Sequence, residues 1–187
     1  MEGQERLLAA EVVLVGVGMA LETATRYLTG AGVGRFRIIG QQESADWPAD
    51  GEAWMAALAG ATLVVRAGFD DDPMLRAAVR LGIPVVVMRG GEPGADVVSF
   101  RHHGPCPHAS LEVPLRPAEP VGEDGGQAVV AGTLAAAEAA WRIARPEDGP
   151  RARHLKLAMD ADPVAQEIPW APECFVCGGQ AREVVPS

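Results

Sequence analysis

The pair Cys174 and Cys177 is the part of this sequence whose residue types and spacing point most directly to chemistry. Two thiolates separated by two residues can reach one metal ion from a tight turn, and the two glycines that follow Cys177 suit such a turn. A redox pair has the same spacing, but it is favoured where the cysteines open a helix, and this segment is rich in glycine. The chain has 3 cysteines, an odd number that argues against a disulfide framework. Metal binding is therefore the favoured interpretation.

A second candidate site is the glycine loop that follows the apolar run from Glu11 to Val15. Gly16 and Gly18 stand between this run and a segment, Ala20 to Leu28, in which apolar residues recur at helical spacing. Strand, glycine turn and helix in this order can form a nucleotide-binding loop. The same glycines also allow a turn to pack tightly without any ligand, and this structural interpretation is the one we favour.

The composition fits one soluble domain and excludes several partners. The chain has 187 residues, of which 48% are hydrophobic and 22% charged, a balance that allows a sizeable core. The net charge of -9 would repel nucleic acid, and no run of Lys or Arg opposes it. No apolar stretch approaches the roughly 18 to 20 residues of a membrane span, and the first residues do not read as a secretory signal. We therefore expect a cytoplasmic protein that binds neither nucleic acid nor membrane.

Apolar runs alternate with helical periodicity along most of the chain. The patterns predict strands at 11–15, 36–39, 61–65, 84–88 and 96–100, and helices at 20–28, 52–58 and 73–81. Strands that alternate with helices through short loops indicate a parallel sheet with right-handed crossovers.

The second half of the sequence begins with a Pro-, Gly- and acid-rich segment, residues 113–126, which predicts a flexible loop. Residues 129–144 follow and are almost wholly apolar and small, with Val130, Leu134, Ala137 and Trp141 on one stripe. A helix that is apolar nearly all round must be covered on more than one side. Leu155, Leu157 and Met159 then alternate with His154 and Lys156, which predicts a strand with one wet face.

Four segments, in order along nearly the whole chain, resemble the ThiF/MoeB family, the Rossmann-type relatives of ubiquitin-activating enzymes. They are residues 2–40, which read EGQERLLAAEVVLVGVG…ATRYLTGAGVGRFRIIG, then RLGIPVVVM, GPCPH and PECFVCGG. The resemblance implies a single α/β domain over residues 1–187. Its expected form is a Rossmann-like, mostly parallel sheet flanked by helices, with a C-terminal antiparallel strand region and a zinc knuckle. Proteins of this family adenylate the C-terminal carboxylate of a ubiquitin-like or peptide partner, usually as dimers around a structural zinc.

The chain departs from this family where ATP would bind. Leu21 occupies the position of the third glycine, and Gly40 replaces the acidic residue that holds the ribose. The family's next segment, which carries an Asn, an Arg, a Gln and a phosphate-binding Lys, is missing, and the chain has no Asn and only Lys156. Adenylyl transfer depends on positioned positive charge and metal, so we expect the chemistry to be crippled and ATP not to bind.

The family's magnesium-binding acid follows the third strand, where this chain reads RAGFDDD. Arg66 falls at the position of the family's first acid, and Asp70 or Asp71 is a shifted replacement at best. The three aspartates can also form a solvated loop with a helix cap. We favour this structural role over a metal site.

The same resemblance proposes a set of zinc ligands. Cys106 aligns with the first cysteine of the family's other knuckle, while the second falls on Ala109. Zinc needs four ligands, and His108 is the nearest replacement, with His103 next. The predicted set is Cys106, His108, Cys174 and Cys177, and a zinc held by four protein ligands is structural. The alternative is an empty, degenerate knuckle.

These observations predict a degenerate ThiF/MoeB-like protein with no catalytic residues of its own, a scaffold or partner-binding subunit. Its partner would be a ubiquitin-like sulfur carrier, a precursor peptide or an active relative. The chain would form a homodimer, or pair with a longer relative, through the small-residue helix at 129–144. The rival hypothesis is an active ATP-dependent adenylyltransferase with an altered nucleotide site. An unrelated dinucleotide-binding domain is disfavoured, because no ribose-binding acid lies near Gly40.

Overall fold

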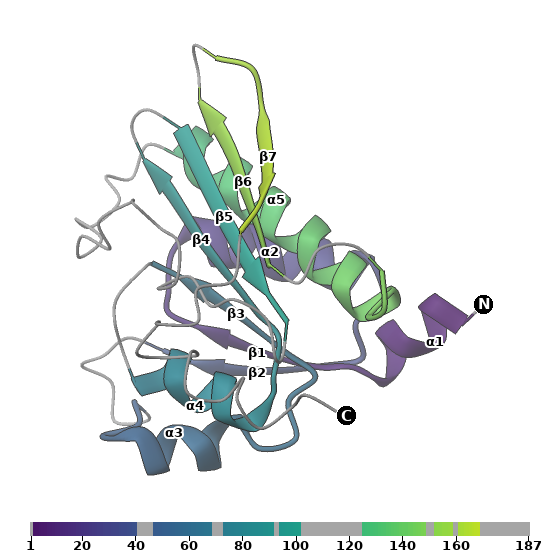
Figure 1. The fold of residues 1–187 in the computed structure, drawn as a ribbon, viewed down its shortest axis with the longest axis vertical. Helices are drawn as coiled ribbons and strands as arrows, with labels where there is room; N and C mark the ends of the chain where they lie inside the picture. The colour runs from purple at the N-terminus through teal and green to yellow at the C-terminus, as the bar shows by residue number, and fades with distance from the viewer. Residues whose placement is uncertain are drawn as a thin grey trace, which may run out of the picture.

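The computed structural model describes residues 2–40, 47–68, 73–91, 94–101, 125–148, 152–158 and 161–168. Within these ranges the chain forms one seven-stranded sheet, in the order β2-β1-β3-β4-β5-β6-β7, with helices on both faces (Figure 1). The strands are β1 (Glu11–Val15), β2 (Arg35–Ile39), β3 (Leu63–Ala67), β4 (Val85–Gly91), β5 (Gly94–Phe100), β6 (Ala152–Ala158) and β7 (Val164–Glu167). The helices are α1 (Glu2–Ala9), α2 (Met19–Gly30), α3 (Gly51–Leu58), α4 (Pro73–Leu81) and α5 (Gly125–Ala144).

The first four strands form the parallel half of the sheet, as the sequence predicts. β1 lies at the centre of this half and pairs with β2 on one side and β3 on the other. Its valines are fully buried because helices cover both faces of the sheet. β3 continues two residues beyond the predicted end, through Arg66 and Ala67, so a charged side chain lies inside a central strand. The predicted Rossmann-like order of the elements is therefore present.

The remaining strands are antiparallel. β5 runs back along β4, with Phe100 opposite Val85, and β6 and β7 continue the meander. The predicted C-terminal antiparallel region is therefore confirmed, but it includes β5 as well, so the described sheet is half parallel and half antiparallel where a mostly parallel sheet was predicted. Because β5 is antiparallel to β4, its last residue, Phe100, lies beside the beginning of β4.

Two hydrophobic cores lie on opposite faces of the sheet. On one face, α1, α2 and α5 pack over Val12 and Leu14 of β1. On the other, α3 and α4 cover Val13 and Val15, with Trp54 of α3 almost fully buried. Asp50 begins α3, because its carboxylate accepts hydrogen bonds from the backbone N–H groups of Glu52 (3.0 Å) and Ala53 (2.9 Å). Within the described residues, no helix is long and apolar enough to cross a membrane.

The helix predicted at 129–144 is present as α5, which begins earlier, at Gly125. The positions that face α2 and the sheet are small, and include Ala131, Ala135 and Ala139. The reason is close packing: a Cβ added at Gly132 would lie 2.2 Å from the carbonyl oxygen of Ala20 in α2. The predicted stripe lies to the side of this contact, where Val130, Leu134 and Trp141 are half-buried and Ala137 is exposed.

The beginning of α5 also corrects the predicted loop at 113–126. Its last two residues, Gly125 and Gly126, are helical, and residues 113–124 lie outside the described part of the chain. Gly125 fits here because a Cβ on it would lie 3.1 Å from the sulfur of Met19, at the beginning of α2. The first turns of α2 and α5 are therefore neighbours.

Candidate functional site

The carboxyl ends of the parallel strands meet at one edge of the sheet, where ligands bind in folds of this kind. Three glycines lie there, Gly16 after β1, Gly40 after β2 and Gly68 after β3. Backbone hydrogen bonds join the ends of the strands, since the N–H of Gly16 donates to Ile39 O (2.9 Å) and that of Gly68 donates to Met88 O (2.9 Å). We call this region the carboxyl edge.

The predicted loop residues Gly16 and Gly18 lie together at this edge, both with a φ of 107°. Gly16 packs closely, because a Cβ there would lie 3.4 Å from the Cβ of Ala67. Gly18 begins α2 without a side-chain cap, so the first amides of the helix point toward the edge. Val17 (49% exposed) and Met19 (47% exposed) flank it. The loop therefore keeps the backbone shape of an anion-attracting helix start, although a bare helix start is not in itself a binding site.

Arg66, at the position where the sequence resemblance predicted an acid, is 4% exposed. It pairs in register with Val15 of β1 and Val87 of β4, so its side chain lies on the face covered by α3 and α4. The nearest predicted ribose-binding position, Gly40, has no side chain. Among the described residues, the ends of β2 and β3 provide no carboxylate for a ribose or for magnesium, and the predicted shifted acids Asp70 and Asp71 lie outside the described ranges.

The end of β4 and the beginning of β5 carry a polar group that the sequence did not predict. Arg89 Nη2 lies 3.2 Å from Asp96 Oδ2, and Asp96 Oδ1 lies 2.9 Å from His154 Nε2. Burial favours protonation of Asp96, but hydrogen bonds and charge from His154 and Arg89 outweigh it and hold the pKa of this carboxyl below its ordinary value. The strand predicted around His154 is present as β6. His154 itself is only 8% exposed, so it does not lie on the solvent-exposed face where it was predicted.

A second polar cluster lies between α5 and the antiparallel strands, at the opposite edge of the sheet. Glu138 Oε1 accepts hydrogen bonds from Ser99 Oγ (2.6 Å) and from Arg142 Nε (3.0 Å), and Arg142 Nη2 donates to Ser99 Oγ (2.7 Å). Arg153 Nη1 approaches Glu138 Oε2 at 3.4 Å. Burial lowers the pKa of Arg142, and the charges of Arg101 and Arg153 lower it further against the opposing effect of Glu138. We call this region, with Arg101, the amino-edge cluster.

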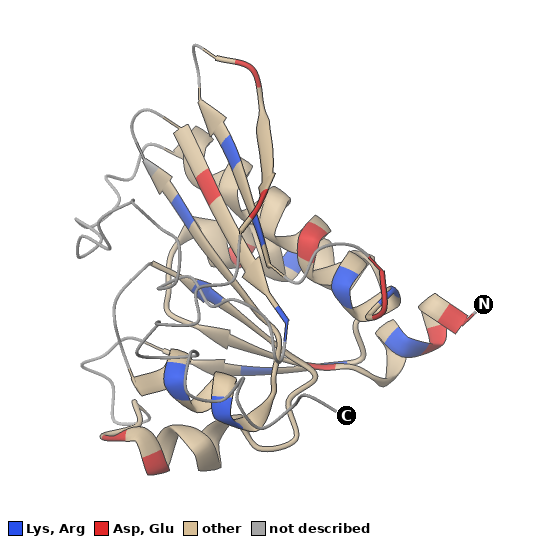
Figure 2. Cartoon of the chain, in the orientation of Figure 1, with Lys and Arg blue, Asp and Glu red and all other residues tan. Residues whose placement is uncertain are grey.

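Figure 2 shows charged residues on strands β4, β5 and β6 and on helix α5. The sequence offered a partial signal for the cluster. Glu138 and Arg142 are four residues apart in an otherwise apolar helix, a spacing typical of a helical ion pair. Their third partner, Ser99, comes from β5, and only the fold brings it there.

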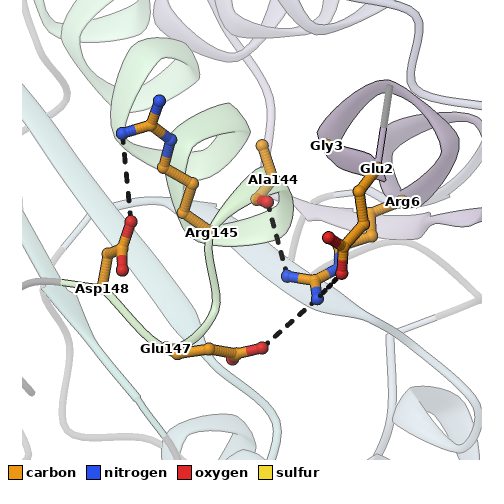
Figure 3. Close-up of a pocket in the computed structure, with 7 residues that line it drawn as sticks. All are labelled: Glu2, Gly3, Arg6, Ala144, Arg145, Glu147 and Asp148. Carbon is orange, nitrogen blue, oxygen red and sulfur yellow. Dashed lines mark hydrogen bonds and ion pairs between the residues drawn. The ribbon is translucent and has the colours of Figure 1, made fainter.

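A pocket of about 480 Å³ lies beside the amino edge, between α1 and the end of α5 (Figure 3). Its charges compensate one another. Arg6 contacts Glu2 (2.5 Å) and Glu147 (3.3 Å), and donates to Ala144 O (3.5 Å). Arg145 faces Asp148 at 3.9 Å. Because each of these two arginines is paired with an acidic side chain, the pocket gives no evidence of a ligand site.

The predicted zinc ligands Cys106, His108, Cys174 and Cys177 all lie outside the described residues, as does His103. Within the described ranges, no group of three or more His, Cys, Asp or Glu side chains is placed to hold a metal ion. The zinc site therefore stays a prediction.

Known family profiles and curated protein sequences give no match to this chain. Solved structures do. MccB of E. coli in complex with MccA superimposes with a TM-score of 0.69 over 94% of this chain and 68% of MccB, at 16% identity. PaaA gives a TM-score of 0.63 over 89% of this chain and 66% of its own, at 13% identity.

A heterocyclase in complex with substrate and cofactor is also similar, with a TM-score of 0.59 and 16% identity. It covers 99% of this chain, while this chain covers only 28% of the heterocyclase. At such identities these likenesses show a shared fold. That fold is a mixed α/β, Rossmann-like architecture.

Proposed function

We propose that this chain is a degenerate ThiF/MoeB-like subunit that binds a peptide or protein partner and has no adenylation chemistry of its own. The observation that carries the proposal is Arg66, a buried cation at the end of β3, where the resemblance expects a magnesium-binding acid. With Gly40 at the ribose position, the carboxyl edge keeps the shape of a nucleotide site without its charged side chains.

The energetics of phosphate chemistry support a chain without adenylation activity. Phosphate chemistry needs positive charge and a metal ion aimed at the developing transition state. The guanidinium of Arg66 lies under α3 and α4 and is 4% exposed, so it is not presented to a phosphate at the Gly16 loop. Each missing electrostatic contact to the transition state raises the activation barrier by on the order of several kcal/mol. A site without the metal ion and the basic groups should therefore adenylate very slowly.

The similar structures support a peptide partner. MccB has been solved with MccA, which is its peptide substrate, and with ATP. The heterocyclase was solved with its own substrate and cofactor. We extend only the partner-binding role to this chain, with a precursor peptide, a ubiquitin-like carrier or an active relative as the partner.

Calorimetry with ATP and magnesium tests the proposal. We expect no saturable heat at millimolar nucleotide, because neither ribose nor metal has an acidic anchor among the described residues of the edge. The matched test of partner binding is co-expression with a peptide, carrier or ThiF/MoeB-like enzyme encoded beside this chain, followed by size-exclusion chromatography. A micromolar dissociation constant for ATP would reject the scaffold.

The second candidate function is an active adenylyltransferase with an altered site. The intact loop geometry at Gly16 and Gly18 favours it, because both glycines keep the positive φ that such a turn requires. Exchange of labelled pyrophosphate into ATP in the presence of the candidate partner separates the two functions. Exchange above background assigns the enzyme, and its absence with retained partner binding assigns the scaffold.

We also propose the structural zinc. Metal analysis of protein purified without chelator should give about one zinc per chain, and Cys177→Ala should release it and lower the melting temperature, because metal binding is coupled to folding. Comparing His108→Ala with His103→Ala identifies the fourth ligand. Protein that contains no zinc would leave the degenerate knuckle as the correct interpretation.

The final part of the proposal is a homodimer that uses the outer surface of α2 and α5. Tyr27 of α2 is 55% exposed and Val129 of α5 is 39% exposed, and Leu134 and Trp141 of α5 are half-buried. Apolar groups gathered on one surface are typical of an interface. Light scattering should give twice the mass of 19.6 kDa. Val129→Asp should shift that mass toward the monomer, whereas a wild-type monomer at tens of micromolar would leave only pairing with a relative.

A further inference from the structure

We propose that the amino-edge cluster is a binding site for an oxyanion, a carboxylate or phosphate group held by Arg101 and Arg142. The site is separate from the Gly16 loop, because β5 ends beside the beginning of β4, at the opposite edge of the sheet. It does not depend on the function proposed above. Its evidence is a set of buried guanidinium N–H groups that the described residues leave without acceptors.

Arg142 provides the first of these groups. The residue is 3% exposed and uses two nitrogens within the cluster, Nε toward Glu138 and Nη2 toward Ser99. The third nitrogen, Nη1, is buried and has no hydrogen-bond acceptor. A buried N–H without an acceptor is rare and costs free energy, so it calls for a partner.

Arg101 provides the others. It directly follows β5, is half-buried, and has both Nε and Nη2 buried without acceptors. These two nitrogens form the side of the guanidinium that binds a carboxylate or phosphate with two parallel hydrogen bonds. The guanidinium carbon lies 6.0 Å from the ring centroid of Trp141, and that of Arg142 lies 6.0 Å from the same centroid. Both guanidinium groups therefore lie close to the ring of Trp141.

The charges of the cluster point to the same kind of ligand. Three arginines, Arg101, Arg142 and Arg153, surround one described carboxylate, that of Glu138. Glu138 is already shared between Ser99, Arg142 and Arg153, so it does not neutralise Arg101. An added oxyanion would supply two oxygens to the free side of Arg101 and reduce the excess positive charge. Carboxylate and phosphate share this chemistry.

The test measures the melting temperature of the full chain as sodium acetate or sodium phosphate replaces sodium chloride at constant ionic strength. Wild type should show a saturable rise, because an anion that binds only the folded state stabilises it. In Arg101→Gln the apparent affinity should fall about tenfold or more, the effect of losing charge-assisted hydrogen bonds. Arg101→Lys keeps the charge without the paired donors, so it should rescue the affinity only in part.

Arg145→Gln is the matched control. Arg145 is a cation at the same end of the molecule, but its side chain is 67% exposed and faces Asp148, so its loss should leave the response unchanged. A rise with acetate alone assigns a carboxylate, and a rise with both anions assigns a general oxyanion site. No rise with either anion, or an equal rise in Arg101→Gln, would overturn the proposal. Arg101→Gln should fold, because it removes buried N–H groups that have no acceptor.

Discussion

The two edges of this sheet use charge in opposite ways. At the carboxyl edge the loop after β1 has Gly16 and Gly18 at positive φ, while Gly40 has no side chain and Arg66 is buried. At the amino edge the backbone is ordinary strand and helix, yet Glu138 and Arg142 are buried in a hydrogen-bonded network. Backbone shape and reactive charge, which a nucleotide site needs together, are separated in this chain.

This contrast shows what holds each region in place. At the ends of β1, β2 and β3 the described residues are held by backbone geometry and close packing, and the polar group Arg89–Asp96–His154 lies further along, at the end of β4. The amino edge depends on polar side chains that have left water, and each of these must keep its partner. Substitutions should therefore have unequal effects at the two edges.

The largest effect should come from Glu138→Ala. Glu138 is 4% exposed, and its removal leaves Arg142 buried beside Arg101 and Arg153 with no compensating acid. Breaking a buried ion pair from one side costs about 3–5 kcal/mol, and urea denaturation should show a loss of this size. The control is the double variant Glu138→Leu with Arg142→Met, in which both charges leave together, and it should recover much of the stability. A single variant within about 1 kcal/mol of wild type would mean that the network contributes little.

Much of the fold follows from the sequence, because the strands are short apolar runs and the turns contain glycine or proline. The site does not follow as far. The buried position of His154 was missed, because its partner Asp96 comes from β5 and the period of β6 alone predicts a wet residue. The closest contact of α5 could not be read from an almost wholly apolar helix, because it depends on Gly132 and the alanines that lie against α2. The zinc ligands remain a prediction from resemblance.

The second-largest loss of stability should come from disturbing the packing of α5 against α2, on the same helix that carries the polar network. Gly132→Ala places a Cβ at 2.2 Å from Ala20 O and 2.8 Å from Thr23 Cβ, so α2 and α5 must separate. Overpacking of this kind costs about 1–3 kcal/mol. Gly126→Ala is the matched control, because nothing lies within 4 Å of its added Cβ, and it should be neutral or slightly stabilising. Equal melting temperatures for the two variants would contradict the close α2–α5 contact.

The smallest effect concerns Asp96, whose contacts with Arg89 and His154 link β4, β5 and β6. Its pKa in the folded protein is below the ordinary value of 3.8. The folded state therefore binds this proton less readily than the unfolded chain, so the stabilisation is fully present above pH 3.8 and is lost as the pH falls through the lower, folded value. Asp96→Asn should cost about 1 kcal/mol at pH 7, as expected for one partly buried charged contact.

Urea denaturation of wild type and Asp96→Asn, from pH 5 downward, measures that contribution directly. The two free energies of unfolding should converge as the solution is acidified, because acid removes from wild type the charge that the substitution has already removed. Asp162→Asn is a suitable control, since Asp162 lies in an exposed turn between β6 and β7, and its curve should follow that of wild type at every pH. A constant difference between wild type and Asp96→Asn down to pH 2.5 would mean that Asp96 acts through its shape and hydrogen bonds.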